Sequence, residues 1–246
     1  MRPVVRGNYP IDCHGDNIQY HEYSDARGEL IGRIGEYCSY CEMQLDSALA
    51  VEHIQPKKPR GCTQIDSQRE MDWNNFLLAC PNCNSTKGNT DVVLEDYLWP
   101  DRDNTFRALK YSEGGIITPA LQGEMAHKAQ NTIHLFGLDK MPSIITDMTD
   151  MNYKNRASDR RWNNRREAWD NAERAKKRLS QNDIDELREQ IVETAQANGY
   201  WSIWLTVFQD DPDMCRRLIE AFPGTCKDCF DATQGYKPVK RQGGQC

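Results

Sequence analysis

Two short cysteine pairs constrain the fold of this chain more than any other feature of its sequence. Cys38-Ser-Tyr-Cys41 and Cys80-Pro-Asn-Cys83 each hold two thiols on a tight turn, and residues 42–79 separate the pairs. Two such turns complete a tetrahedral zinc site with Zn–S distances of about 2.3 Å. Because sulfur then fills every ligand position, the zinc is structural and joins two distant chain segments. We therefore predict a four-cysteine zinc site at Cys38, Cys41, Cys80 and Cys83.

A redox role is the alternative for the two pairs, and a second metal site is considered for later cysteines. A redox CxxC motif usually lies in a strand–helix–strand pattern, and neither pair has that context. The second zinc site would use four cysteines, namely Cys215, Cys226, Cys229 and Cys246. Against it, Cys246 belongs to the tail KPVKRQGGQC, whose polar composition predicts disorder.

The composition predicts a cytoplasmic protein with reduced thiols and no membrane association. The N-terminal MRPVVRGNYPID lacks the apolar core of a signal peptide, and the most apolar run, YWSIWLTVF at 200–208, is too short to span a bilayer. The net charge of -6 and the pI of about 5.5 disfavour a protein that binds nucleic acid alone, because phosphate contacts need Lys and Arg.

Apolar periodicity divides the chain into a mixed N-terminal part and a helical C-terminal part, which predicts the α+β fold class. A short helix is expected at 25–35 and a strand at 115–119. The helical period recurs in 153–179 and 182–198. The expected boundaries are an N-terminal extension at 1–36, a core at 37–110, a connector at 111–126 and a mainly α-helical C-terminal domain at 127–246.

The helix predicted at 153–179 is rich in Lys and Arg, in contrast to the acidic chain as a whole. Its charge would allow the helix to follow a phosphate backbone. A solvated helix face, or a face that pairs with an acidic partner, explains the same charge, and the sequence leaves these alternatives open.

A third motif lies between the cysteine pairs, where VEHIQPKKPRG places Glu52 beside His53. Within NNFLLACPNCNSTKGN, Asn75 precedes the second pair by five positions and Asn84 follows it directly. In this order and spacing, residues 37–90 resemble the zinc-knuckle form of the HNH nuclease family. The resemblance implies a small ββα-metal nuclease core that hydrolyses nucleic acid, with DNA as the expected substrate.

Chemistry and resemblance together assign a role to each motif residue. A neutral imidazole accepts a proton from water near pH 7, so His53 is the expected general base. Glu52 and Asn84 offer oxygen ligands suited to a catalytic Mg²⁺ or Mn²⁺, although the family commonly has Asp at the first position. The resemblance implies that Asn75 bridges the loop and holds the His53 ring, and that Lys87 contacts phosphate. Three basic loop residues are further candidates for phosphate contacts: Lys57, Lys58 and Arg60.

A second resemblance extends further along the chain. The chain is similar to the HNH subunits of Septu-type and retron-associated anti-phage systems. The similarity lies in the segments GEYCSYCE, VEHIQPK, AQNTIHLFGLDK, NRASDRRWNNRREAW and AFPGT. That resemblance implies a hetero-oligomer with an ABC/SMC-like ATPase, which would supply the DNA engagement that an acidic nuclease lacks. The helices of the C-terminal domain at 127–246, including residues 153–179 and 200–208, are the expected docking surface for this partner.

Two other functions fit the same motifs. A stand-alone HNH restriction or repair nuclease would use the same chemistry without an ATPase. A zinc-knuckle module would bind nucleic acid or protein without cutting it. Such a binding module has no need for Glu52, His53, Asn75 and Asn84 together, whereas bound zinc is expected under all of these functions.

Overall fold

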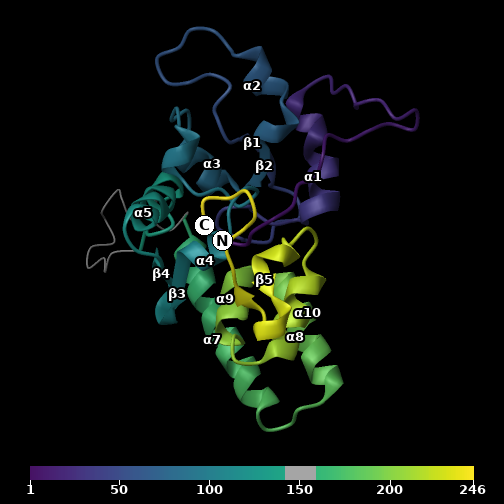
Figure 1. The fold of residues 1–246 in the computed structure, drawn as a ribbon, viewed down its shortest axis with the longest axis vertical. Coiled ribbons are helices and arrows are strands. Elements are labelled where there is room, and N and C mark those ends of the chain that lie inside the picture. The colour runs from purple at the N-terminus through teal and green to yellow at the C-terminus, as the bar shows by residue number, and fades with distance from the viewer. Residues whose placement is uncertain (142–158) are drawn as a thin grey trace, which may run out of the picture.

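Three antiparallel two-stranded sheets and the helices around them make up this computed structural model, which describes residues 1–141 and 159–246 (Figure 1). The strands are β1 (Ala50–His53), β2 (Phe76–Ala79), β3 (Leu109–Ser112), β4 (Ile116–Pro119), β5 (Phe230–Asp231) and β6 (Lys237–Pro238). The helices are α1 (Arg27–Ile34), α2 (Ser67–Met71), α3 (Pro81–Lys87), α4 (Thr105–Ala108), α5 (Glu124–Phe136), α7 (Arg161–Leu179), α8 (Asp185–Asn198), α9 (Trp201–Val207) and α10 (Pro212–Ala221). This mixture confirms the predicted α+β fold class.

A ββα unit forms where the sequence places the second cysteine pair. β1 pairs with β2 along its whole length, and β2 consists of buried apolar side chains. α3 begins directly after β2, because Pro81 suits the first turn of a helix and the Cys80 sulfur accepts the Cys83 amide. The unit therefore places the start of β1 beside the second cysteine pair, and the last residue of α3, Lys87, beside His53 at the end of β1.

The turn of the β3–β4 hairpin packs against α7. Gly115 has a φ of +72°, and a Cβ at this position would lie 2.9 Å from the backbone nitrogen of Arg166. The close approach requires glycine, since any side chain would collide with the α7 backbone. Arg165 completes the contact by donating hydrogen bonds from Nε to the Gly115 carbonyl (2.5 Å) and from Nη2 to the Leu138 carbonyl (2.8 Å).

The locally predicted elements are confirmed, with small shifts at their ends. The helix expected at 25–35 is the 3₁₀ turn η1 (Tyr23–Ala26) followed by α1, the strand expected at 115–119 is β4, and the helix expected at 182–198 is α8. The helix expected at 153–179 is observed as α7, and residues 153–158 lie outside the described part of the chain. Buried side chains from all these regions form one hydrophobic core. The domain boundaries expected from the sequence, at residues 36, 110 and 126, stay a prediction.

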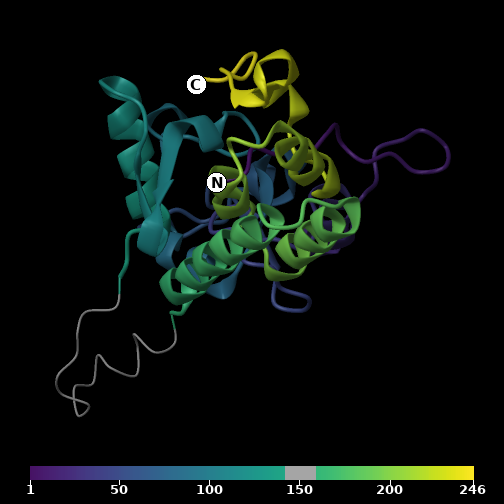
Figure 2. The same ribbon diagram turned by 90° about the horizontal axis from the view of Figure 1, so that it is seen from below.

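The aromatic segment 200–208 lies inside the core and not on a docking surface. This segment contains α9, which contacts α7, α8 and α10. Helices α7 and α8 also pack side by side (Figures 1 and 2). Trp204 has no exposed surface, and Trp201 is 1% exposed and donates from its indole nitrogen to the Leu218 carbonyl at 2.9 Å. The prediction that this segment docks a partner is therefore wrong, because its apolar side chains are already buried within the chain.

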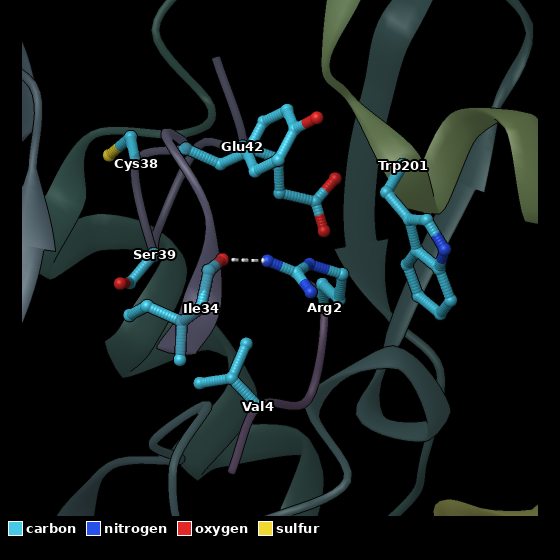
Figure 3. A pocket seen from close by; sticks show the side chains of 8 residues that line it. Arg2, Val4, Ile34, Cys38, Ser39, Glu42 and Trp201 are labelled. Carbon is cyan, nitrogen blue, oxygen red and sulfur yellow. Dashed lines mark hydrogen bonds between the residues drawn. The ribbon is translucent and has the colours of Figure 1, made fainter. Parts of the chain in front are cut away.

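The two chain ends are packed against the rest of the fold. Arg2 donates hydrogen bonds to the Ile34 carbonyl (2.6 Å) and to the Thr225 hydroxyl (2.8 Å), beside a cavity of about 10 Å³ that has room for a single water (Figure 3). The predicted disorder of the C-terminal tail is wrong. The Gln245 amide binds the Asp103 carboxylate at 2.7 Å, and Cys246 is buried. These partners lie far away in sequence, so local composition gave no sign of them.

Among the helices of the described residues, none combines the length and apolar character needed to cross a bilayer.

Candidate active site and metal centre

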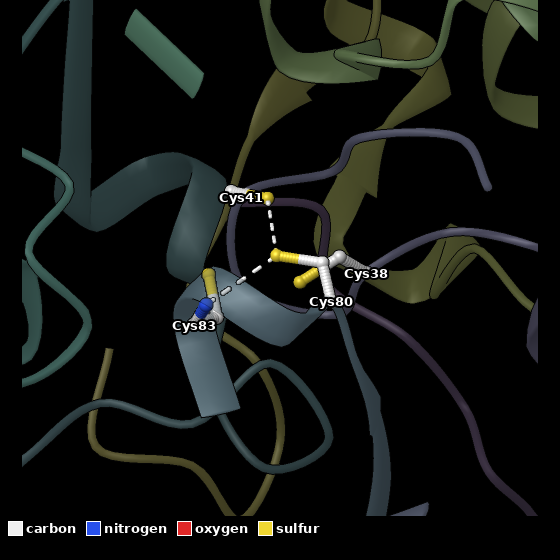
Figure 4. A group of neighbouring side chains, drawn as sticks. All are labelled: Cys38, Cys41, Cys80 and Cys83. Atoms are coloured by element: carbon white, nitrogen blue, oxygen red, sulfur yellow. Dashed lines mark hydrogen bonds between the residues drawn. The ribbon is translucent and has the colours of Figure 1, made fainter. Parts of the chain in front are cut away.

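Four buried cysteines from the two pairs converge on one point (Figure 4). Their sulfur atoms all lie within 4.8 Å of one another, and the Sγ atoms of Cys41 and Cys80 are 3.6 Å apart. A tetrahedral site with Zn–S bonds of about 2.3 Å requires sulfur atoms about 3.8 Å apart. The cluster therefore fits a structural zinc ion bound by four thiolates, as the spacing of the pairs predicts.

The second cysteine set does not form a comparable cluster in the described structure, where the four-cysteine group is the one candidate metal site of this kind. The Cys215 thiol donates to the Phe208 carbonyl at 3.3 Å, and the Cys246 thiol to the Asn104 carbonyl at 3.5 Å. These two side chains therefore act as buried core residues with local hydrogen bonds.

Arg161, at the start of α7, contacts the four-cysteine cluster directly. Its Nη1 atom lies 3.0 Å from the Cys83 sulfur and donates to the Phe136 carbonyl at 2.7 Å. Its Nη2 atom forms an ion pair with Asp159 at 2.7 Å, and the side chain is 3% exposed. A zinc ion with four thiolates carries a net negative charge, which this guanidinium offsets. This contact was not predictable from the sequence, because Arg161 falls within a segment with the composition of a basic surface helix.

His53 is the last residue of β1 and is only 9% exposed. Its Nε2 atom lies 3.0 Å from the Glu70 carbonyl, which can only accept a hydrogen bond. In the neutral ring the proton therefore resides on Nε2, and Nδ1 carries the lone pair. Burial lowers the pKa of His53 from its ordinary value of 6.5, and the nearby Lys57 and Lys87 lower it further, against the opposing effect of the Glu70 carbonyl. His53 is therefore neutral at pH 7 and has the form that a general base requires.

Asn75 fixes the backbone that holds His53. Its Oδ1 accepts the Gln55 amide at 2.7 Å, while its Nδ2 donates to the carbonyls of Gln55 (2.8 Å) and Arg69 (2.9 Å). These bonds tie together the two ends of the segment 55–69. Because Arg69 precedes Glu70, Asn75 also fixes the carbonyl that orients the imidazole.

Tyr23 belongs to the site but lies outside the motifs found in the sequence. Its ring centroid is 4.7 Å from that of His53, on the side contributed by the N-terminal extension. Lys57 Nζ lies 4.1 Å above the Tyr23 ring and 2.7 Å from the Glu70 carboxylate. Tyr23, Lys57 and Glu70 therefore form a group of contacts around His53, and no local sequence signal could have placed Tyr23 there.

Glu52 and Lys87 form a buried ion pair beneath His53. Lys87 Nζ lies 2.6 Å from Glu52 Oε1 and donates to the His53 carbonyl, also at 2.6 Å. The Tyr40 hydroxyl donates to the other Glu52 oxygen. Burial raises the pKa of Glu52, and the contacts with Lys87 and Tyr40 oppose that rise. Lys87 is 2% exposed, so its ammonium faces Glu52 and not the solvent, where the expected phosphate contact would lie.

The expected catalytic metal pair is not assembled in this arrangement. Carboxylate and amide oxygens suit Mg²⁺ chemically, and Asn84 lies on the exposed side of α3. Glu52, however, is 3% exposed and already neutralised by the Lys87 ammonium. As placed, Glu52 and Asn84 therefore do not fit a divalent cation.

Comparison with known proteins assigns the ββα region to a family. Residues 38–90 match the model of the HNH endonuclease family, and this segment contains both cysteine pairs, β1, β2, α3 and His53. An HNH endonuclease domain thus occupies this part of the chain. A search among curated proteins finds no match. The family match carries no assignment to a narrower group within the family.

Proposed function

We propose that this protein is an endonuclease that hydrolyses DNA phosphodiester bonds, with His53 as its general base. The observation that carries the proposal is the hydrogen bond from His53 Nε2 to the Glu70 carbonyl, within a segment that matches the HNH endonuclease family. This bond directs the Nδ1 lone pair to the water that attacks phosphorus. The attack breaks the bond to the 3′ oxygen, which leaves with a proton taken from solvent.

The other residues of the site act through His53 or through charge. Asn75 and Tyr23 position the imidazole by the contacts described above. Lys58 and Arg60 are exposed on the loop that follows β1 and can bind backbone phosphates. We include Mg²⁺ or Mn²⁺ as a cofactor in the proposal, and this ion would stabilise charge on the phosphate.

The direct test is incubation of the purified protein with supercoiled plasmid DNA and, separately, with a folded RNA, each with Mg²⁺ or with EDTA. Nicked or linear plasmid supports the proposal. Cleavage of RNA alone would change the substrate. If zinc-loaded protein bound either polymer without cutting it, a zinc-knuckle binding module would replace the nuclease.

We further propose that the nuclease acts in the cytoplasm as the effector of an anti-phage defence complex with an ABC/SMC-like ATPase. The acidic chain favours such a partner, because its net charge of -6 opposes tight independent binding to DNA. The exposed face of α7, with Arg166, Arg174 and Lys177, is the remaining candidate for the docking surface. The alternative is a stand-alone restriction or repair nuclease.

Charge reversal on α7 separates these alternatives. The variant Arg166→Glu/Arg174→Glu/Lys177→Glu is expected to lose co-purification with a co-expressed ATPase while it keeps bound zinc. Full cleavage by the isolated wild-type protein, unchanged when the ATPase is added, would favour the stand-alone nuclease.

The pH dependence of cleavage should report the protonation of His53. Protonated imidazole cannot accept a proton, so kcat/KM is expected to rise with pH as His53 loses its proton and then to level off. Because burial lowers the pKa of His53, the midpoint should lie below 6.5. A midpoint above 6.5 in a pH–rate profile would contradict this assignment.

Substitution of Tyr23 should slow catalysis without weakening substrate binding. Tyr23→Leu removes the ring that packs on His53, and misplacement of a general base lowers kcat by roughly 10- to 100-fold. KM should stay near the wild-type value, and Tyr23→Phe, which keeps the ring, should restore kcat. If the leucine variant instead raised KM at unchanged kcat, Tyr23 would be a substrate contact.

A further inference from the structure

The loop that follows β1 projects from the fold on a closed neck. The Asp66 amide donates to the Lys57 carbonyl at 2.7 Å, so residues 58–65 lie beyond this hydrogen bond. Two more bonds fix the loop, from the Arg60 amide to the Asn89 carbonyl (3.0 Å) and from the Cys62 amide to the Pro59 carbonyl (3.0 Å). In Figure 1 the loop projects beside α2, on the side away from α7 and α8. These hydrogen bonds restrain the neck and the first half of the loop.

The projecting part combines positive charge with an exposed apolar side chain. Lys58 and Arg60 are exposed and form no ion pair within the described residues. The basic residues at the base of the loop differ, since Lys57 pairs with Glu70 and Arg69 with Asp91. Ile65 is 51% exposed in spite of its apolar side chain. Free cations around an exposed apolar group suit a polyanion with apolar edges, as in nucleic acid.

The neck of the loop is connected to the general base through one residue. Lys57, at the neck, binds the Glu70 carboxylate at 2.7 Å, and the Glu70 carbonyl lies 3.0 Å from His53 Nε2. A nucleic acid held by the loop would therefore pass beside His53. This position distinguishes the loop from α7, whose basic face lies on the C-terminal helices.

We infer that residues 58–65 enter the major groove of duplex DNA, with Lys58 and Arg60 on backbone phosphates and Ile65 against thymine methyl groups. The inference rests on the proposed nuclease function and specifies the form of its substrate. The major groove is about 12 Å wide and admits two chain segments side by side, whereas the minor groove is only about 6 Å wide. Thymine methyl groups are the apolar feature of the major groove.

A natural thiol at the loop tests the inference without cleavage. Cys13 and Cys62 are exposed, whereas the other cysteines are buried, so Cys13→Ser leaves Cys62 as the reactive thiol. In the variant Cys13→Ser/His53→Ala, an AT-rich duplex is expected to slow maleimide labelling of Cys62 at least about tenfold, and the major-groove ligand methyl green should reverse this protection. If bound duplex left the labelling rate unchanged, or if the minor-groove ligand netropsin alone reversed the protection, the inference would fail.

The salt dependence of binding gives a second, independent measurement. Lys58→Ala/Arg60→Ala should make the negative slope of log K against log salt shallower by about 1.8, since each phosphate contact contributes about 0.9 to its magnitude. The matched control is Arg174→Ala/Lys177→Ala on α7, which should leave the slope unchanged. A loss of slope in the control pair alone would move the DNA interface to α7. Because both measurements use protein with His53→Ala, their failure is distinct from a failure of the nuclease assignment.

Discussion

Cys80→Ser is expected to abolish zinc binding and cooperative unfolding of the HNH region. Cys80 is at once a member of the sulfur cluster and the cap of α3, so its loss removes a ligand and the start of the ββα helix. Zinc binding to four-ligand sites in small domains is worth about 10–16 kcal/mol, comparable with the whole stability of about 5–15 kcal/mol of a typical domain. The measurements are zinc content by mass spectrometry and thermal unfolding by circular dichroism.

Cys62→Ser is the matched control, because Cys62 is exposed on the loop after β1 and lies outside the cluster. This variant should keep one zinc per chain and the wild-type unfolding curve. A Cys80→Ser protein with a full complement of zinc and an unchanged curve would show that the four cysteines are not the zinc site.

Lys87→Met is expected to destabilise the protein by about 3–5 kcal/mol at pH 7. Methionine keeps the length of the side chain but leaves the Glu52 carboxylate buried without its 2.6 Å ion-pair partner, and an unpaired buried charge carries a cost of this size. The His53 carbonyl also loses its hydrogen-bond donor. Urea unfolding of wild type and variant measures the difference in free energy.

The double variant Glu52→Gln/Lys87→Met identifies the source of that loss. It removes both charges and keeps a side-chain amide that can still accept from the Tyr40 hydroxyl, so most of the stability should return. If the double variant were as unstable as Lys87→Met alone, shape and packing of Lys87 would explain the loss, and the ion pair would not.

Local spacing made part of the site predictable from the sequence. The CxxC pairs define the zinc ligands because each pair fixes its own turn, and the position of His53 before Asn75 and Asn84 indicates the family. Amphipathic periodicity likewise predicts α8, since one helix face is buried whatever its partner.

Contacts between distant segments were not predictable. Tyr23 reaches His53 from the N-terminal extension, and Arg161 reaches Cys83 across 78 positions. The buried pair of Lys87 with Glu52 follows from the register of β1 and α3, which no residue pattern specifies. The docking role predicted for residues 200–208 was wrong for a related reason. An apolar run predicts that its side chains are buried, but not whether they are buried against the same chain or against a partner.

Single-turnover cleavage of supercoiled plasmid DNA by wild type and His53→Ala, in Mg²⁺, decides whether His53 is the general base of a nuclease. His127→Ala is the control, because His127 is exposed on α5, far in sequence from the HNH region. Loss of a general base lowers the rate by about 10²–10⁴-fold, so His53→Ala should be slower by that factor, with zinc content and unfolding unchanged. The control should match wild type. A His53→Ala protein that cuts at the wild-type rate would contradict this role for His53.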